Sequence, residues 1–172
     1  MKTRTYFIAL LLLLSLPAQL EWRPTVGLSV PEPETIVIDS LFEKTVELIK
    51  KYETLHQPKD YPLVGYGHKV LKGESFSRTE PLDSVTADSL LRVDLLKNCA
   101  VFRSLGRDSL LLGTLSYNVG STKILKSELY KRLKAGNRDI YQQYIQYHYY
   151  KQRPVKSIKN RRKEEFELLY NH

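Results

Sequence analysis

Apolar residues recur at spacings of three and four along most of the chain, a pattern that predicts amphipathic helices. Asp39 or Ser40 can cap the first of these helices. Its apolar face consists of Leu41, Phe42, Val46, Ile49 and Tyr52. Glu53 comes four positions after Ile49, so the pattern places a carboxyl group on the apolar face at the end of this helix.

A strand-forming segment follows the first helix. Valine and tyrosine stand between glycines over residues 61–69, residues 72–74 read as a turn, and residues 75–78 are the expected returning strand. The segment therefore predicts one small hairpin or three-stranded sheet.

The remainder of the chain is predicted to be helical. Asp83 or Ser84 caps a helix that ends near Gly106, and Asp108 caps an almost continuously apolar helix that ends before Gly120. Further helices are expected over residues 127–134, over residues 139–150 and from residue 157 onward. A small sheet against several helices gives an α+β, mainly helical, fold class in one domain, residues 39–172.

The first residues of the chain read as a targeting segment. Lys2 and Arg4 precede an apolar run of eleven residues, 6–16. This run is shorter than the roughly 20 residues that span a bilayer, so residues 1–19 are interpreted as a secretory signal peptide, with an uncleaved anchor as the alternative. Prolines at positions 24, 31 and 33 predict an irregular tether over residues 20–38. The protein is therefore expected in the periplasm or cell envelope.

The charge balance narrows the class of partner. The chain has a formal charge of +8, and without Lys2 and Arg4 it keeps 25 − 19 = +6. A basic exported protein suits an anionic polymer, and charge alone does not choose among wall glycan, a membrane surface and nucleic acid. The tyrosines of residues 141–150 and the basic run 159–163 are interpreted as helix faces, so no nucleic-acid partner is predicted. Cys99, the only cysteine, is expected to be a buried structural thiol.

Glu53 is the principal candidate for chemistry. Burial among apolar groups favours the protonated carboxyl, which is the form that a general acid needs to protonate a glycosidic oxygen. The alternative is a glutamate at a helix end that reaches solvent, as most glutamates do. His148 and His172 lie apart without ligand spacing, so neither a metal nor a cofactor is predicted.

Five short motifs occur in a fixed order over residues 41–170. They are Gly65-Tyr66-Gly67-His68 preceded by Glu53, Leu90-Leu91-Arg92-Val93-Asp94, Ser116-Tyr117-Asn118-Val119-Gly120, Leu133-Lys134-Ala135-Gly136-Asn137, and the closing stretch of residues 155–165. In these motifs the chain resembles the phage-type lysozymes, glycoside hydrolase family 24. The resemblance implies a lysozyme-like fold and cleavage of the β-1,4 bond between N-acetylmuramic acid and N-acetylglucosamine. It also implies that Glu53 is the acid and that Lys159 or Arg161 places a cation near it.

The chain departs from the family between its two expected carboxylates. Six residues separate Glu53 from Asp60, fewer than the family has, and Leu63 stands at the family's threonine position, five before His68. Asp60 is therefore a candidate base that activates water, for which an inverting hydrolase needs carboxyls about 6.5–9.5 Å apart. The alternative is that Asp60 only opens the turn before Pro62.

The remaining candidates divide between structure and substrate binding. The resemblance implies a structural pair of His68 with Asp94, which we favour over a catalytic His68. Glycan contacts are expected from His56, Leu63, Tyr66 and Asn118.

Three functional hypotheses remain open at this point. The first is an exported, monomeric muramidase that acts on peptidoglycan strands and serves lysis, wall remodelling or passage of a secretion or conjugation apparatus. The second is a lytic transglycosylase that uses Glu53 alone. The third is a non-catalytic lysozyme-like protein that binds the wall or docks on an envelope machine, an interpretation that the missing threonine and shortened loop favour.

Overall fold

The computed structural model describes residues 33–170, with side chains from residue 40 onward. The predicted signal peptide and most of the predicted tether lie outside the described residues. The first helix, α1 (Pro33–Glu53), starts earlier than predicted and continues through residues 33–38, where an irregular tether was expected. Pro33 is compatible with this start, because the N–H of the first residue of a helix makes no hydrogen bond within the helix and proline can therefore lack it.

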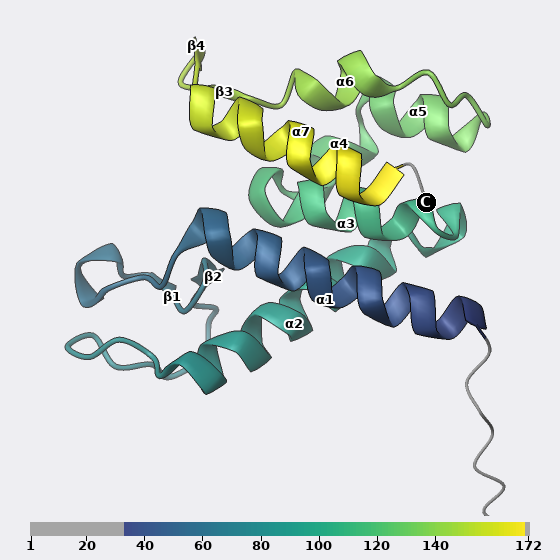
Figure 1. Ribbon diagram of the computed structural model, residues 1–172. Coiled ribbons are helices and arrows are strands. Elements are labelled where there is room, and N and C mark those ends of the chain that lie inside the picture. Colours follow the sequence, from purple (N-terminus) through teal and green to yellow (C-terminus); the bar gives the residue numbers. More distant parts are fainter. Residues whose placement is uncertain (1–32, 171–172) are drawn as a thin grey trace, which may run out of the picture. The chain divides into compact units, whose positions relative to one another are not determined.

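The α1 helix ends at the candidate acid. Thr54, the next residue, adopts a left-handed φ of 54°, and its N–H donates to the carbonyl of Lys50 at 3.1 Å. The chain then passes through a short 3₁₀ helix, Pro58–Asp60, into the first strand. Glu53 is therefore the last residue of α1. Figure 1 shows the chain passing from this end of the helix into the loop that leads to β1.

The predicted hairpin is present, but its returning strand lies earlier than expected. Strand β1 (Leu63–Val64) pairs antiparallel with β2 (His68–Lys69), and Val64 faces His68. Gly65 and Gly67 turn the chain with φ values of 58° and 102°, which favour glycine. Because these glycines reverse the chain immediately after β1, residues 68–69 become the partner strand, and residues 75–78 form no strand. The prediction of a strand there is wrong.

The two central helices follow. Asp83 caps α2 (Ser84–Val101) as predicted, accepting from the N–H groups of Val85 and Thr86 at 3.0 and 2.9 Å. A 3₁₀ turn, Arg103–Leu105, leads into α3 (Asp108–Val119). The predicted cap at Asp108 is wrong: this residue is the first of the helix, and its carboxylate binds Arg138 at 2.5 Å.

The C-terminal third begins with three short helices, α4 (Ser121–Leu125), α5 (Glu128–Lys134) and α6 (Tyr141–Ile145), of which α5 is capped by Ser127 as predicted. The long helix predicted over residues 139–150 is wrong, because after α6 the chain forms a second hairpin. Its strands are β3 (Tyr149–Tyr150) and β4 (Arg153–Pro154), and the two left-handed residues between them make a tight turn. The last helix is α7 (Lys156–Tyr170).

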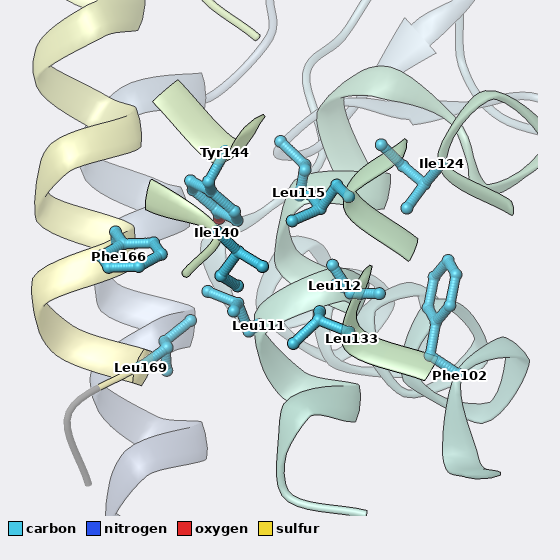
Figure 2. Close-up of a cluster of buried hydrophobic side chains, with 11 residues drawn as sticks. Phe102, Leu111, Leu112, Leu115, Ile124, Leu133, Ile140, Tyr144, Phe166 and Leu169 are labelled. Atoms are coloured by element: carbon cyan, nitrogen blue, oxygen red, sulfur yellow. The ribbon is translucent and has the colours of Figure 1, made fainter. Parts of the chain in front are cut away.

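The α3 helix is the centre of the packing and contacts α2, α7, α1 and α4. Figure 2 shows Leu111, Leu112 and Leu115 of α3 within one cluster that also contains Tyr144 of α6 and Phe166 of α7. A smaller cluster joins α1 to α2 through Val46, Ile49, Leu91 and Leu95. This arrangement confirms the α+β, mainly helical fold class, and it anchors both α1 and α7 to the same central helix.

Cys99 lies where α2 approaches α3 closely. A Cβ atom at Gly113 would lie 2.4 Å from Sγ of Cys99 and 2.9 Å from its backbone N and Cα, so only glycine fits. Burial raises the pKa of the Cys99 thiol to about 11, which supports the expected structural role. None of the described helices is long and apolar enough to cross a bilayer.

Candidate active site

Glu53 is held from one side by α7. Nη1 of Arg161 donates to Oε1 of Glu53 at 2.6 Å, and the Glu53 side chain is 18% exposed. Of the two cations that the resemblance offered, Arg161 is therefore the one beside the carboxylate. Oε2 of Glu53 makes no hydrogen bond with any described residue.

Arg161 is itself fixed by a buried network. Its Nε donates to Oε1 of Glu165 at 2.8 Å, and the hydroxyl of Tyr144 donates to Oε2 of the same carboxylate at 2.8 Å. Arg162, fully buried, lies 3.1 Å from Glu165 as well. Burial alone would lower the pKa of Arg161, but Glu165 and Glu53 outweigh it and raise this pKa. The guanidinium is therefore a permanent cation that α6 and α7 hold in place.

The free oxygen of Glu53 borders a space beside Gly67. A Cβ atom at Gly67 would lie 3.5 Å from Oε2 of Glu53 and 3.8 Å from Nε2 of His56, in ordinary contact with both. The φ of 102° at Gly67 also disfavours any side chain there. Glycine thus keeps a side chain away from Oε2 of Glu53.

Asp60 lies on the far side of the same imidazole. Its Oδ2 accepts from the N–H of Gln57 at 2.8 Å and lies 3.5 Å from Nδ1 of His56. The backbone hydrogen bond from Gln57 is the main cause that lowers the pKa of Asp60, and His56 adds to it. The carboxylate is therefore a fixed anion that closes a capping box over residues 57–60. This geometry supports the structural interpretation of Asp60, and its direct role as a base stays a prediction.

Tyr66 and Leu63 occupy different surroundings. Tyr66 packs against the cluster of Val46 and Ile49, and its carbonyl accepts from the hydroxyl of Tyr117 at 2.9 Å. Burial raises the pKa of Tyr117, so this hydroxyl is a neutral donor that ties the hairpin to α3. Leu63, at the family's threonine position, is 36% exposed on β1. A leucine side chain has no hydroxyl with which to hold a water molecule.

His68 is part of a three-residue cluster. Nδ1 lies 2.5 Å from Oδ2 of Asp94, so the pair that the resemblance implied is present, and Nε2 lies 2.8 Å from Oε2 of Glu74. Burial lowers the pKa of His68, but the hydrogen bonds to Glu74 and Asp94 outweigh it and raise the pKa. With both ring nitrogens engaged, His68 joins the hairpin to α2.

Asn118 lines a cavity of about 600 Å³ whose lining does not include Glu53. Its other lining residues are Val119, Lys123, Gln146, Tyr147, Tyr149, Tyr150 and Ile158. All eight come from residues 109–127 and 140–163, two stretches that contain no aspartate or glutamate. Two of the lining residues are close in sequence to residues of the site: Asn118 follows Tyr117 in α3, and Ile158 is one helical turn before Arg161 in α7.

The sequence missed two participants of the site. Glu74 was interpreted only as a turn residue, although it binds His68. The buried network of Tyr144, Arg162 and Glu165 was also missed. The spacing of four between Arg161 and Glu165 could have indicated an ion pair on one helix face.

Comparison with known proteins identifies the family. The protein-family model of phage lysozyme matches residues 49–165, a range that includes Glu53, the first hairpin and Arg161. A comparison with curated protein sequences gives no match.

Solved structures of other proteins share the fold. An endolysin from Escherichia coli O157:H7 phage FAHEc1 superposes with a TM-score of 0.61 at 23% identity, covering 74% of this chain and 91% of the endolysin. The muramidase domain of SpmX from Asticaccaulis excentricus gives a TM-score of 0.62 at 23% identity, covering 75% and 96% of the two chains. Since the family match spans more than half of the sequence and the fold agrees with it, the chain belongs to the phage lysozyme family of glycoside hydrolases.

Proposed function

We propose that the protein is an exported muramidase that cleaves the β-1,4 bond between N-acetylmuramic acid and N-acetylglucosamine in peptidoglycan. Glu53 is the general acid. The observation that carries the proposal is the asymmetry of its carboxyl: Arg161 binds Oε1 at 2.6 Å, whereas Oε2 is unpartnered and borders the space beside Gly67.

This asymmetry assigns a task to each oxygen. When Glu53 acts as the acid, the proton that it donates is on Oε2, because Oε1 accepts from Arg161. When the glycosidic C–O bond breaks, its electron pair goes to the leaving oxygen, which takes the proton from Oε2. Arg161 then stabilises the carboxylate that remains, without any rearrangement of the site.

The chemistry of the cavity near Asn118 suits peptidoglycan. Lys123 and exposed tyrosines line the cavity near Asn118, and aromatic rings with amide groups suit sugar rings. The absence of acidic residues from the stretches that line this cavity suits the carboxylates of stem peptides. We assign glycan contacts to His56, Leu63, Tyr66 and Asn118. Export follows from the predicted signal peptide and brings the protein to the compartment that holds this polymer.

Product analysis tests the bond that is cut. The full-length protein is incubated with purified peptidoglycan, and the released muropeptides are identified by mass spectrometry before and after borohydride reduction. The proposal predicts products with a reducible muramic acid end, and no release by Glu53→Gln. Reducible glucosamine ends, anhydro ends, or tight binding without any release would each contradict it. The last of these would identify a wall-binding protein.

A further inference from the structure

Arg162 is a buried cation that shares its counter-ion with Arg161. Its side chain is fully buried, and its Nε, Nη1 and Nη2 atoms make no hydrogen bond with a described residue. Its one ion pair among the described residues is with Oε1 of Glu165, 3.1 Å from Nη2, and the same oxygen accepts from Nε of Arg161 at 2.8 Å. Because a buried charge is costly unless it is paired, one carboxylate has to serve two buried arginines.

The charges of this buried network balance only when Glu53 is ionised. Arg161 and Arg162 carry two positive charges, and Glu165, held between the two guanidinium groups, carries one negative charge. The other oxygen of Glu165 accepts from the hydroxyl of Tyr144 at 2.8 Å, and burial raises the pKa of Tyr144, so this donor is neutral. The network therefore has a net charge of 2 − 1 = +1 while Glu53 is protonated, and Glu53 as a carboxylate brings it to zero.

Arg162 decides how much of the charge of Arg161 acts on Glu53. If Arg161 were the only cation, Glu165 would offset its charge, and a Glu53 carboxylate would give the network an unbalanced negative charge. Arg162 offsets Glu165 instead. The charge of Arg161 is then left for Oε1 of Glu53, which lies 2.6 Å from its Nη1. Such interactions are strong where water is excluded.

Resting on the function proposed above, we propose that Arg162 is a positioning residue for the catalytic acid: it offsets the charge of Glu165, so that Arg161 stabilises the Glu53 carboxylate that proton donation leaves. Arg162 is fully buried and acts only through Glu165 and Arg161. The proton passes from Oε2 of Glu53 to the leaving oxygen, and no group of the buried network gains or loses one. The network supplies a fixed charge where negative charge develops.

The neighbouring titratable groups leave this balance unchanged. Tyr117 of α3 faces Glu53, and burial is the main cause that raises the pKa of Tyr117. Tyr52 of α1 faces the guanidinium that binds Glu53, and burial together with a hydrogen bond to a carboxylate raises its pKa to about 12. Both phenols are therefore neutral at the pH of the test. His56 borders Gly67, as Glu53 does, and it is present in every variant compared, so its own titration does not alter the comparison.

The test compares a neutral with a charged residue at position 162. Full-length Arg162→Gln and Arg162→Lys are incubated with soluble peptidoglycan fragments, and kcat is measured as a function of pH. Without the charge, Glu53 should keep its proton to higher pH and be a weaker acid. The alkaline loss of kcat in Arg162→Gln should therefore move up by about one pH unit, and kcat in acid should fall severalfold. Arg162→Lys keeps the charge and should stay close to wild type.

Glu165→Gln makes the opposite change. It removes the negative charge that Arg162 offsets, so the alkaline loss of kcat should move to lower pH. The double variant Arg162→Gln/Glu165→Gln has the net charge of wild type, and its alkaline loss should return to the wild-type position. A purely structural role predicts shifts of the same sign in both single variants, because loosened packing admits water in each.

Three results would overturn the proposal. They are an unchanged pH profile in Arg162→Gln, an equal shift in Arg162→Lys, and shifts of the same sign in Arg162→Gln and Glu165→Gln. Circular dichroism identifies a variant that does not fold. If a single variant fails in this way, Arg162→Lys and the double variant still apply, since a shift in either of them would contradict the charge balance.

A second measurement separates this proposal from the proposed function. NMR of the labelled Glu53 carboxyl carbon follows its protonation without turnover, and the same shifts between variants are expected there. Absence of these shifts would overturn the role of Arg162 even in an active enzyme. If Glu53→Gln remains fully active, the proposed function fails instead, which is a separate result.

Discussion

Nη1 of Arg161 lies 2.6 Å from Oε1 of Glu53, joining two residues that are 108 positions apart in the sequence. This contact connects the last residue of α1 to α7 and defines which carboxyl oxygen faces the substrate side. It also makes the site depend on a buried ion network, since Glu165, which holds Arg161, is fully buried. The residues that hold the candidate acid in place therefore also contribute to the stability of the fold.

Replacement of Arg161 by methionine should strongly destabilise the protein. The change removes a buried cation from Glu53 and Glu165, and breaking a buried ion pair from one side costs about 3–5 kcal/mol. Urea denaturation of the full-length protein measures this cost.

Lys51→Ala is the matched control, because Lys51 binds Glu164 between the same two helices at 2.7 Å but is 59% exposed. Its cost should be below about 1 kcal/mol. Similar costs for the two variants would show that the Arg161 network is not a determinant of stability.

The His68 cluster should make stability depend on pH. Because the pKa of folded His68 is raised above its usual 6.5, its contribution is fully present below about pH 6.5 and is lost as the pH rises through the folded pKa. The difference in unfolding free energy between wild type and His68→Gln should therefore shrink from pH 6 to pH 8.5. Asp94→Asn should weaken this dependence, and a difference that grows with pH would refute the assignment.

Gly113→Ala should destabilise the packing of α2 on α3. The new methyl group would lie 2.4 Å from Sγ of Cys99, and overpacking of this kind costs about 1–3 kcal/mol. Addition of Cys99→Ala should recover only part of the loss, since the backbone N and Cα of residue 99 are 2.9 Å away. Thermal unfolding measures both effects. Full recovery of stability in the double variant would contradict the predicted backbone clash, because it would show that the new methyl group clashes with the Cys99 sulfur alone.

Tyr149 and Tyr150 should contribute to wall binding. They are 58% and 61% exposed at the cavity near Asn118, so alanine at either position should weaken binding of the Glu53→Gln variant to insoluble peptidoglycan about three- to tenfold. Affinity should also fall as salt is added, because the cavity is lined by segments without acidic residues. Leu96→Ala, on the exposed face of α2, should have no effect. Equal binding by all variants would place the glycan elsewhere.

The features that were predicted correctly from the sequence are those that depend on residues close to one another in the chain. Asp83 and Ser127 cap α2 and α5 as expected, because a cap is formed by a side chain and the next few backbone N–H groups. The second hairpin was missed because its tyrosines also fit a helical spacing. Lys151 and Gln152 form the turn of this hairpin through left-handed conformations that no pattern indicated.

The candidate site could be predicted in part. Glu53 was found from the end of an apolar face, but the choice between Lys159 and Arg161 required knowledge of how α7 rotates against α1. The relationship of Asp60 to His56 was likewise hidden, because it depends on a capping box that turns one carboxylate oxygen toward the ring. Contacts of this kind are tertiary and leave no regular spacing in the sequence.

The rate of peptidoglycan cleavage by Glu53→Gln tests the central claim most directly. Glu47→Gln is the matched control, since Glu47 is on the same helix and its side chain is 69% exposed. We predict that Glu53→Gln folds normally but loses about a hundredfold or more in rate, whereas Glu47→Gln keeps the wild-type rate. A folded Glu53→Gln variant that cleaves at a rate close to wild type would contradict the assignment of Glu53 as the acid.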